Sequence, residues 1–272
     1  MRVAASARPA SSAATCPAAR PATTSVRCTD ATRPSPRGHA GSRPPGARTP
    51  AATRAAGEDV GERRWLTDNA ARTRDWAELC VRDEVGVLVL ASTRSVFDPA
   101  TDVVPFAEDA TPHPSSPYGR SKHAAEREAL VFAGPELRVC VLRLAQLVGP
   151  GQDPTSFVAR AAAACREGRA PELWGAGTGA RDWLWVGDAC EAFVAAVTRH
   201  EARGVVHVGA GRATSLRDVA VALMRAHGVA GEPVARPERA ADEDRAFLAV
   251  GRARALLGWQ PRTPLERWAA LV

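Results

Sequence analysis

The sequence predicts an α/β fold built on a doubly wound parallel sheet, and three observations carry this prediction. Residues 86–91 are wholly apolar and residues 137–144 nearly so, which is typical of strands buried on both faces of a parallel sheet. A helical pattern over 118–132 separates the two runs, so a strand-helix-strand unit is present. Helical and extended patterns keep alternating after residue 144, which predicts further strands and a small appended C-terminal region.

The elements follow in a regular order. Residues 65–81 have the apolar spacing of a helix, and a loop rich in Pro and Asp occupies 98–117 before the helix at 118–132. Thr214 is expected to cap a helix at 215–227. The other expected elements are helices at 157–166 and 189–199, extended segments at 182–186 and 204–208, and closing segments at 256–259 and 263–271.

The start of the chain differs in composition from the rest. Residues 1–58 mix Ala, Arg, Pro and Thr without a helical or strand period, and such a mixture buries too little apolar surface to fold. We therefore expect a disordered, low-complexity segment over 1–64 and one folded domain over 65–272. Residues 1–58 contain nine arginines and only two acidic residues, Asp30 and Glu58. Most of the net charge of +6 therefore lies in this segment. The folded part is nearly balanced in charge, and we expect no nucleic-acid partner.

The composition also bears on location and metal binding. No window approaches 18 consecutive apolar residues and no secretory signal is visible, so we expect a cytoplasmic protein with no membrane partner. The six cysteines are scattered and form no C-x-x-C pair. They predict free, mostly buried thiols and no metal site.

The only tyrosine and the only lysine of the chain, Tyr118 and Lys122, lie four residues apart. On a helix this spacing places both side chains on one face. A phenol has a pKa of about 10, and a nearby ammonium group lowers it by stabilising the phenolate. The pair can then act as a base when a hydroxyl is oxidised and as an acid in the reverse step. Two exposed helical residues without a function remain the alternative.

A hydroxyl group follows the first predicted strand. Thr93 ends the sequence Ala91-Ser92-Thr93 at the carboxyl end of that strand, 25 residues before Tyr118. Open α/β sheets bind ligands in the crevice outside this end of their strands. Thr93 is thus a candidate to contact a substrate, and an ordinary turn residue is the alternative.

Seven segments together resemble the successive signatures of the extended short-chain dehydrogenases that act on nucleotide sugars, the NAD-dependent epimerase/dehydratase family. The resemblance covers residues 65–272 and implies a Rossmann-like sheet, an NAD or NADP cofactor and a nucleotide-sugar substrate. The segments are Leu90–Phe97, Pro114–Lys122 with Glu126 after it, Arg143–Pro150, Gly175–Asp182, Val186–Asp188, His207–Gly211 and Leu257–Pro261.

The resemblance assigns the chemistry to three residues. Thr93 would hydrogen-bond the reacting sugar hydroxyl, and Tyr118 would exchange its proton. Lys122 would bind the nicotinamide ribose and lower the phenol pKa, while the hydride passes to or from the cofactor.

On the substrate side, Gln146 stands where the family often has an Asn near the diphosphate, and Arg181 is similar to the arginine that binds a phosphate. Arg239 and Asp242 resemble the pair that frames the nucleotide. The alternatives are an ion pair of Arg181 with a neighbouring aspartate, and a solvated loop around Arg239.

Several positions depart from the family pattern. Arg94 and Ser95 replace the Asp-Glu pair that follows the threonine in 4,6-dehydratases, so an epimerase or reductase is favoured. Phe97 and Asp98 replace the usual Tyr-Gly, which changes the expected sugar pocket. Ala249 stands where an Asp is common.

The largest departure is at the N-terminus, where the family's G-x-x-G-x-x-G turn is missing. That turn holds the pyrophosphate of the cofactor on backbone N–H groups and a helix N-terminus. Codons for Ala10–Cys16 permit Gly-Phe-Ile-Gly-Ser-His-Leu in another frame, which suggests a frameshift over residues 5–65. We therefore expect a sheet incomplete at the N-terminus and no useful binding of NAD or NADP by the chain as it stands.

Three interpretations of the whole chain stay open. The first is an epimerase or reductase of the family, for which a homodimer is an expected form. The second is a non-catalytic Rossmann-like remnant that binds a nucleotide sugar or a partner. The third treats the Arg/Ser-rich leader as a transit peptide or a nucleic-acid arm. The choice between NAD and NADP also stays open, because the residue that would decide it belongs to the missing region.

Overall fold

The computed structural model describes residues 67–238 and 245–272. Its main sheet contains β1 (Val87–Thr93), β2 (Arg138–Leu144) and β7 (Gly204–Val208), all parallel and in the order β1-β2-β7. These strands confirm the ones predicted at 86–91, 137–144 and 204–208. The expected boundary between 1–64 and 65–272 lies outside the described residues.

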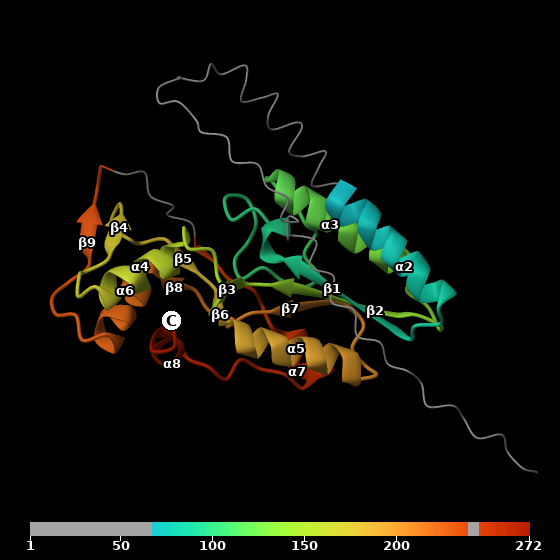
Figure 1. Cartoon of the computed structure of the whole chain (residues 1–272). Coiled ribbons are helices and arrows are strands. Elements are labelled where there is room, and N and C mark those ends of the chain that lie inside the picture. Colours follow the sequence, from blue (N-terminus) through green and yellow to red (C-terminus); the bar gives the residue numbers. More distant parts are fainter. Residues whose placement is uncertain (1–66, 239–244) are drawn as a thin grey trace, which may run out of the picture.

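Helices cover both faces of this sheet (Figure 1). Leu88 and Leu90 of β1 pack in the cluster under α2 and α3, while Val89 packs with Ala192 of α5 on the other face. Alternate residues of one strand thus meet opposite layers, which explains the wholly apolar pattern. The covering helices are α2 (Arg72–Arg82), α3 (Pro117–Val131), α5 (Val186–Thr198) and α7 (Gly251–Leu257).

A second apolar core lies in the C-terminal half, around Trp183 and Trp268. Three helices surround it: α4 (Phe157–Arg166), α6 (Leu216–Ala226) and α8 (Leu265–Ala269). Short strand pairs flank these helices and complete the small appended region that the sequence predicts. The pairs are β3 (Gln146–Val148) with β6 (Trp183–Trp185), β4 (Glu172–Trp174) with β9 (Val234–Arg236), and β5 (Ala180–Arg181) with both β8 (Thr214–Ser215) and β10 (Arg245–Ala246).

The cap of one helix differs from the sequence prediction. The N-cap of α6 is Ser215, whose Oγ accepts a hydrogen bond from the N–H of Asp218 at 3.0 Å, so the expected cap at Thr214 is wrong. Ser215 and Thr214 both belong to β8, where Thr214 pairs with Arg181 and Ser215 with Ala180. Cys190 is exposed on α5, unlike Cys80, Cys140 and Cys165, which are free and buried as expected. Cys16 and Cys28 lie outside the described residues.

The first described element also has an unexpected form. The helix predicted from residue 65 begins, within the described residues, as a π-helical turn, η1 (Thr67–Ala71), and continues as α2. π turns inside helices often mark functional sites. None of the helices in the described part of the chain is long and apolar enough to cross a membrane. Over the same residues no His, Cys, Asp and Glu side chains gather into a metal site.

Candidate active site

The carboxyl end of β1 and the start of α3 meet in the fold, and we call the place where they meet the corner. Thr93 is the last residue of β1, and its Oγ1 accepts a hydrogen bond from the N–H of Ser95 at 3.2 Å. α3 begins two residues before Gly119, whose N–H donates to the Oγ of the N-cap Ser116 at 3.0 Å. Gly119 packs against the backbone of η2 (Arg94–Val96), the turn that follows Thr93. The first turn of α3, which carries Tyr118, therefore lies against the turn that follows Thr93.

Lys122 lies one turn further along α3 and is only 4% exposed. The face of α3 that carries Lys122 is therefore buried at this position. This burial argues against the alternative that Tyr118 and Lys122 are both exposed helical residues. A buried ammonium group is costly unless it has a partner or a ligand. The acid–base pair of Tyr118 and Lys122 stays a prediction.

Asn69 of η1 also lies at the corner, although no motif in the sequence selects it. Its Nδ2 donates to the Oγ of Ser121 at 3.0 Å, and that hydroxyl donates to the carbonyl oxygen of Tyr118 at 2.8 Å. The Oδ1 of Asn69 is buried and finds no hydrogen-bond donor among the described groups. A buried amide oxygen usually has a donor, so this atom points to a ligand or water at the corner. The signal was weak in the sequence because the partner lies 52 residues away.

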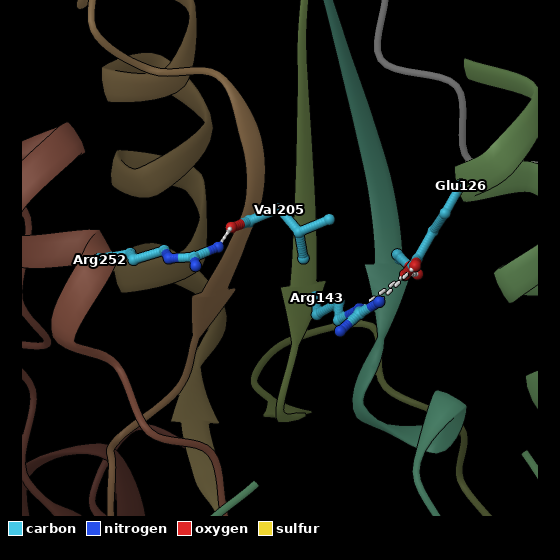
Figure 2. Close-up of polar contacts among 5 residues, drawn as sticks. Glu126, Arg143, Val205 and Arg252 are labelled. Atoms are coloured by element: carbon cyan, nitrogen blue, oxygen red, sulfur yellow. Dashed lines mark hydrogen bonds and ion pairs between the residues drawn. The ribbon is translucent and has the colours of Figure 1, made fainter. Parts of the chain in front are cut away.

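A buried ion pair fastens α3 to the main sheet (Figure 2). Arg143 of β2 donates from Nε and Nη2 to the two carboxylate oxygens of Glu126 at 3.0 and 2.7 Å. The hydroxyl of Ser92 on β1 donates to the same carboxylate at 2.5 Å. Glu126 is two helical turns beyond Tyr118, so the pair fixes the helix that bears the candidate acid–base residues.

An aromatic stack continues from this pair toward β7. The guanidinium carbon of Arg143 lies 5.1 Å from the ring centroid of Phe97, and that ring meets His207 edge-on at 5.6 Å. Burial, with the positive charge of Arg143 adding to it, lowers the pKa of His207 to about 3. The imidazole is therefore neutral at physiological pH. Phe97 also stacks on Phe106, so the Phe97 substitution noted in the sequence builds core rather than an open pocket.

Of the residues expected to contact the substrate, Gln146 and Arg181 lie on two segments that are neighbours in the fold, β3 and β5. The N–H of Gln146 donates to the carbonyl oxygen of Asp182 at 2.9 Å, which sets Gln146 beside the residue that follows Arg181. Gln146 is exposed and Arg181 partly so, as a ligand contact requires. Arg239 and Asp242 lie outside the described residues, although the strand that follows them, β10, pairs with Arg181 through Ala246.

Asp182 is not a simple ion-pair partner. Its carboxylate accepts hydrogen bonds from the N–H groups of Ala210, Gly211 and Leu248. Burial raises the pKa of Asp182 to about 6, against the lowering effect of these amides. A Cβ on Gly209 would lie 2.4 Å from this carboxylate, which explains the glycine there.

Asp188 plays a similar part for the end of the chain. It accepts from the N–H groups of Arg262 and Thr263 and from the Thr263 hydroxyl, and its carbonyl oxygen accepts from Trp259 Nε1. Buried aspartates thus join segments that the sequence analysis singled out. Asp182 joins Gly175–Asp182 to His207–Gly211, and Asp188 joins Val186–Asp188 to Leu257–Pro261.

The corner fits one half of a nicotinamide dinucleotide. Lys122 and the Oδ1 of Asn69 are buried polar groups that could hold the ribose and carboxamide of a nicotinamide nucleoside. The pyrophosphate half needs a glycine turn, and the 272 residues contain no G-x-x-G-x-x-G sequence.

The chain is similar to several known proteins. Residues 49–209 match the NAD dependent epimerase/dehydratase family. A UDP-glucose 4-epimerase from Mycolicibacterium smegmatis is 34% identical over 170 residues, which are 61% of this chain and 54% of that protein. The chain thus spans about half the length of this relative.

Two solved structures show the same fold. A UDP-glucose 4-epimerase from Thermotoga maritima, solved with UDP-glucose, has a TM-score of 0.69 and 29% identity over 79% of this chain and 71% of its own. The protein MoeE5, solved with UDP-glucuronic acid and NAD, has a TM-score of 0.65 and 34% identity over 75% of this chain and 69% of its own. The Rossmann-like fold predicted from the sequence is therefore confirmed.

Proposed function

This chain belongs to the NAD dependent epimerase/dehydratase family, and we propose that it interconverts a hydroxyl and a keto group on the sugar of a nucleotide sugar. The observation that carries the proposal is the corner between β1 and α3. There the only tyrosine and the buried, only lysine of the chain lie on the helix that packs against the turn after Thr93.

Each residue has a separate task. Thr93 hydrogen-bonds the reacting hydroxyl and orients it. Tyr118 takes the proton of that hydroxyl on oxidation and returns it on reduction. Lys122 stabilises the phenolate, because a cation within a few ångström lowers the pKa of an acid. NAD or NADP, when bound, supplies the hydride acceptor, and Lys122 would hold its ribose.

Two solved structures and the exposed or partly exposed side chains of Gln146 and Arg181 support the substrate class. Two related structures carry UDP-sugars by name, and Arg181 with Gln146 offers a donor fork and an amide at one edge. A planar guanidinium suits phosphate oxygens. We include Arg239 and Asp242 as nucleotide contacts in this proposal. Arg94 and Ser95 lack the acid and base that water elimination needs, so we favour an epimerase or reductase over a dehydratase.

Turnover tests the proposal directly. The full chain is incubated with NAD+ or NADP+ and with UDP-glucose, UDP-glucuronic acid or a dTDP-sugar, and the products are separated by chromatography. Because the sequence predicts no useful binding of NAD or NADP by the chain as it stands, we expect turnover only once the frame over residues 5–65 is restored. One substrate should then yield its epimer or its keto form, and none should react when Tyr118→Phe is added. Equal turnover by Tyr118→Phe would contradict the assignment.

A second candidate function is binding of a nucleotide sugar without catalysis. It is favoured by one observation, the absence of a G-x-x-G-x-x-G turn from the sequence. Fluorescence titration with NADH and calorimetry with UDP separate the two. Micromolar binding of both supports the enzyme, whereas binding of UDP alone supports the remnant.

Three further parts of the proposal concern the whole protein. We propose a cytoplasmic homodimer, with the folded domain over 65–272 and a low-complexity leader over 1–64. Light scattering in solution tests the dimer, cell fractionation tests the location, and limited proteolysis tests the domain boundary.

A further inference from the structure

The carboxylate of Glu126 is tied to two strands at once. Glu126 is 1% exposed and accepts three hydrogen bonds, from the Ser92 hydroxyl and from two nitrogens of Arg143. Ser92 and Arg143 are directly opposite each other in the register of β1 and β2. The carboxylate therefore lies over one rung of the sheet, immediately before Thr93.

Glu126 is also the next neighbour of Lys122 along the same face of α3. Residues four apart on a helix have Cβ atoms about 5–6 Å apart, and opposite charges at this spacing attract. A carboxylate that turned toward Lys122 would neutralise the ammonium group and remove its effect on the Tyr118 phenol. Three charge-assisted or short hydrogen bonds on the strand side hold the Glu126 carboxylate in the other direction.

A buried ion pair is a weak device for stability alone. The cost of removing two charges from water can exceed their attraction, and apolar replacements of such pairs are often neutral or stabilising. The pair between Glu126 and Arg143, with side chains 2% and 5% exposed, is of this kind. The ion pair is therefore better explained by a positioning role. It holds the carboxylate of Glu126, the acidic residue of α3 that lies four positions from Lys122.

We propose that Arg143, together with Ser92, is a positioning residue for the acid–base pair: it holds the Glu126 carboxylate against the strands and so leaves the charge of Lys122 to act on Tyr118. This inference rests on the proposed function only in taking Tyr118 and Lys122 as that pair.

Other charges surround the corner and must be accounted for in its titration. Besides Lys122, Glu126 and Arg143, the Asp, Glu, Arg and His side chains on α3 and on the elements packed against it belong to five elements. They are Asp68 of η1, Arg72, Arg74, Asp75, Glu78 and Arg82 of α2, Arg94 of η2, Arg138 of β2, and Arg120, His123, Arg127 and Glu128 of α3. Burial lowers the pKa of His123, with Glu126 raising it and Arg143 and Arg127 lowering it. His123 is thus neutral at the alkaline pH where a phenol titrates, and it does not interfere.

The composition of the chain makes the test clean. Tyr118 is the only tyrosine, so a protein labelled with ¹³Cζ-tyrosine gives one signal whose chemical shift against pH yields the pKa of Tyr118 without turnover or cofactor. We expect Arg143→Met to raise this pKa by about 1 or more, since the freed carboxylate then compensates Lys122. The double variant Arg143→Met/Glu126→Gln should return it to the wild-type value, because no carboxylate remains to turn.

Two controls make the result decisive. Arg127→Met removes one positive charge from the neighbouring helix position and leaves the buried pair intact, so the pKa of Tyr118 should stay within about 0.3 of the wild type. Arg143→Lys keeps the charge and loses the two-pronged contact, so it should give an intermediate rise. Arg143→Lys also replaces Arg143→Met in the test if circular dichroism shows that Arg143→Met does not fold.

The outcomes separate this inference from the proposed function. An ordinary phenol pKa of about 10 in the wild type contradicts the proposed function itself. A lowered wild-type pKa that neither Arg143→Met nor Arg143→Lys changes overturns the inference alone. A rise that persists in the double variant, or an equal rise in Arg127→Met, also overturns it, because the effect would not then pass through Glu126.

Discussion

Gly119 of α3 faces the carbonyl oxygen of Ser95 so closely that a Cβ on residue 119 would lie 2.0 Å from that oxygen. No real side chain tolerates such an approach to a backbone atom. The glycine directly after Tyr118 therefore lets α3 come down onto the turn that follows Thr93. The meeting of these two segments depends on this one missing methyl group.

We expect Gly119→Ala to push the start of α3 away from η2. The free energy of unfolding should fall by about 1–3 kcal/mol, the usual cost of overpacking, despite the higher helix propensity of alanine. Denaturant titration measures this. Gly134→Ala is the matched control, since a Cβ on Gly134 meets nothing within 4 Å, and it should cost far less. Equal stability of Gly119→Ala and the wild type would mean that the two segments can separate freely.

For the substrate side, Arg181→Ala should weaken the binding of UDP by about 1.5–3 kcal/mol, the scale of a hydrogen bond to a charged group. Calorimetry with UDP and dTDP measures the loss. Arg217→Ala provides the control, because Arg217 is half-exposed and pairs with Glu232 on the surface. Unchanged affinity of Arg181→Ala for both nucleotides would assign Arg181 a structural role.

The neutral, buried imidazole of His207 predicts a specific pH dependence of stability. Its pKa is about 3 in the folded chain against 6.5 as the ordinary value, so the unfolded chain binds a proton between these limits and the folded chain does not. Titration of His207 therefore leaves the free energy of unfolding unchanged above pH 6.5 and lowers it as the pH drops toward 3. The pKa of Asp182, raised by burial to about 6, acts in the opposite sense between pH 6 and its ordinary 3.8.

His207→Asn keeps a side-chain donor near Nδ1 but does not titrate. Its free energy of unfolding should fall less on acidification than that of the wild type, by roughly 2–5 kcal/mol over the whole window. Denaturant titrations at several pH values give the comparison. Parallel pH curves for the two proteins would show that His207 is accessible to protons in the folded state.

Asp188 should hold the end of the chain in place. Asp188→Ala removes the acceptor for two backbone N–H groups and the Thr263 hydroxyl, and we expect a loss of about 2–4 kcal/mol of stability. Glu191→Ala is the control, since Glu191 is exposed and forms a long surface ion pair with Arg262, at 3.8 Å. It should change stability by less than about 0.5 kcal/mol. Similar losses in both variants would show that burial of Asp188 does not matter.

The long elements could be predicted because their signals are local. The apolar runs of β1 and β2 and the helical spacing of α3 each lie within one short window, and the rule for strand ends then places Thr93 near Tyr118. The short strands gave no such signal. β5, β8 and β10 have two residues each and exist only through pairing with segments distant in the sequence.

The same reason explains what the sequence missed at the site. Asn69 contacts the start of α3 through Ser121, and the pairing of β3 with β6 sets Gln146 opposite Trp183, two residues from Arg181 in the chain. In both cases a contact between segments distant in the sequence sets the position of the residue. The cap of α6 is Ser215 and not Thr214, although both residues belong to β8, and nothing in the strand pairing explains that choice.

The central claim is that Tyr118 is an acid–base residue activated by Lys122, and the pKa of the single tyrosine tests it most directly. The ¹³Cζ signal of Tyr118 is titrated in the full-length wild type and in Lys122→Ala, with circular dichroism to verify folding. We predict a pKa well below 10 in the wild type and a return toward 10 in Lys122→Ala. A value of about 10 in both proteins would contradict the account.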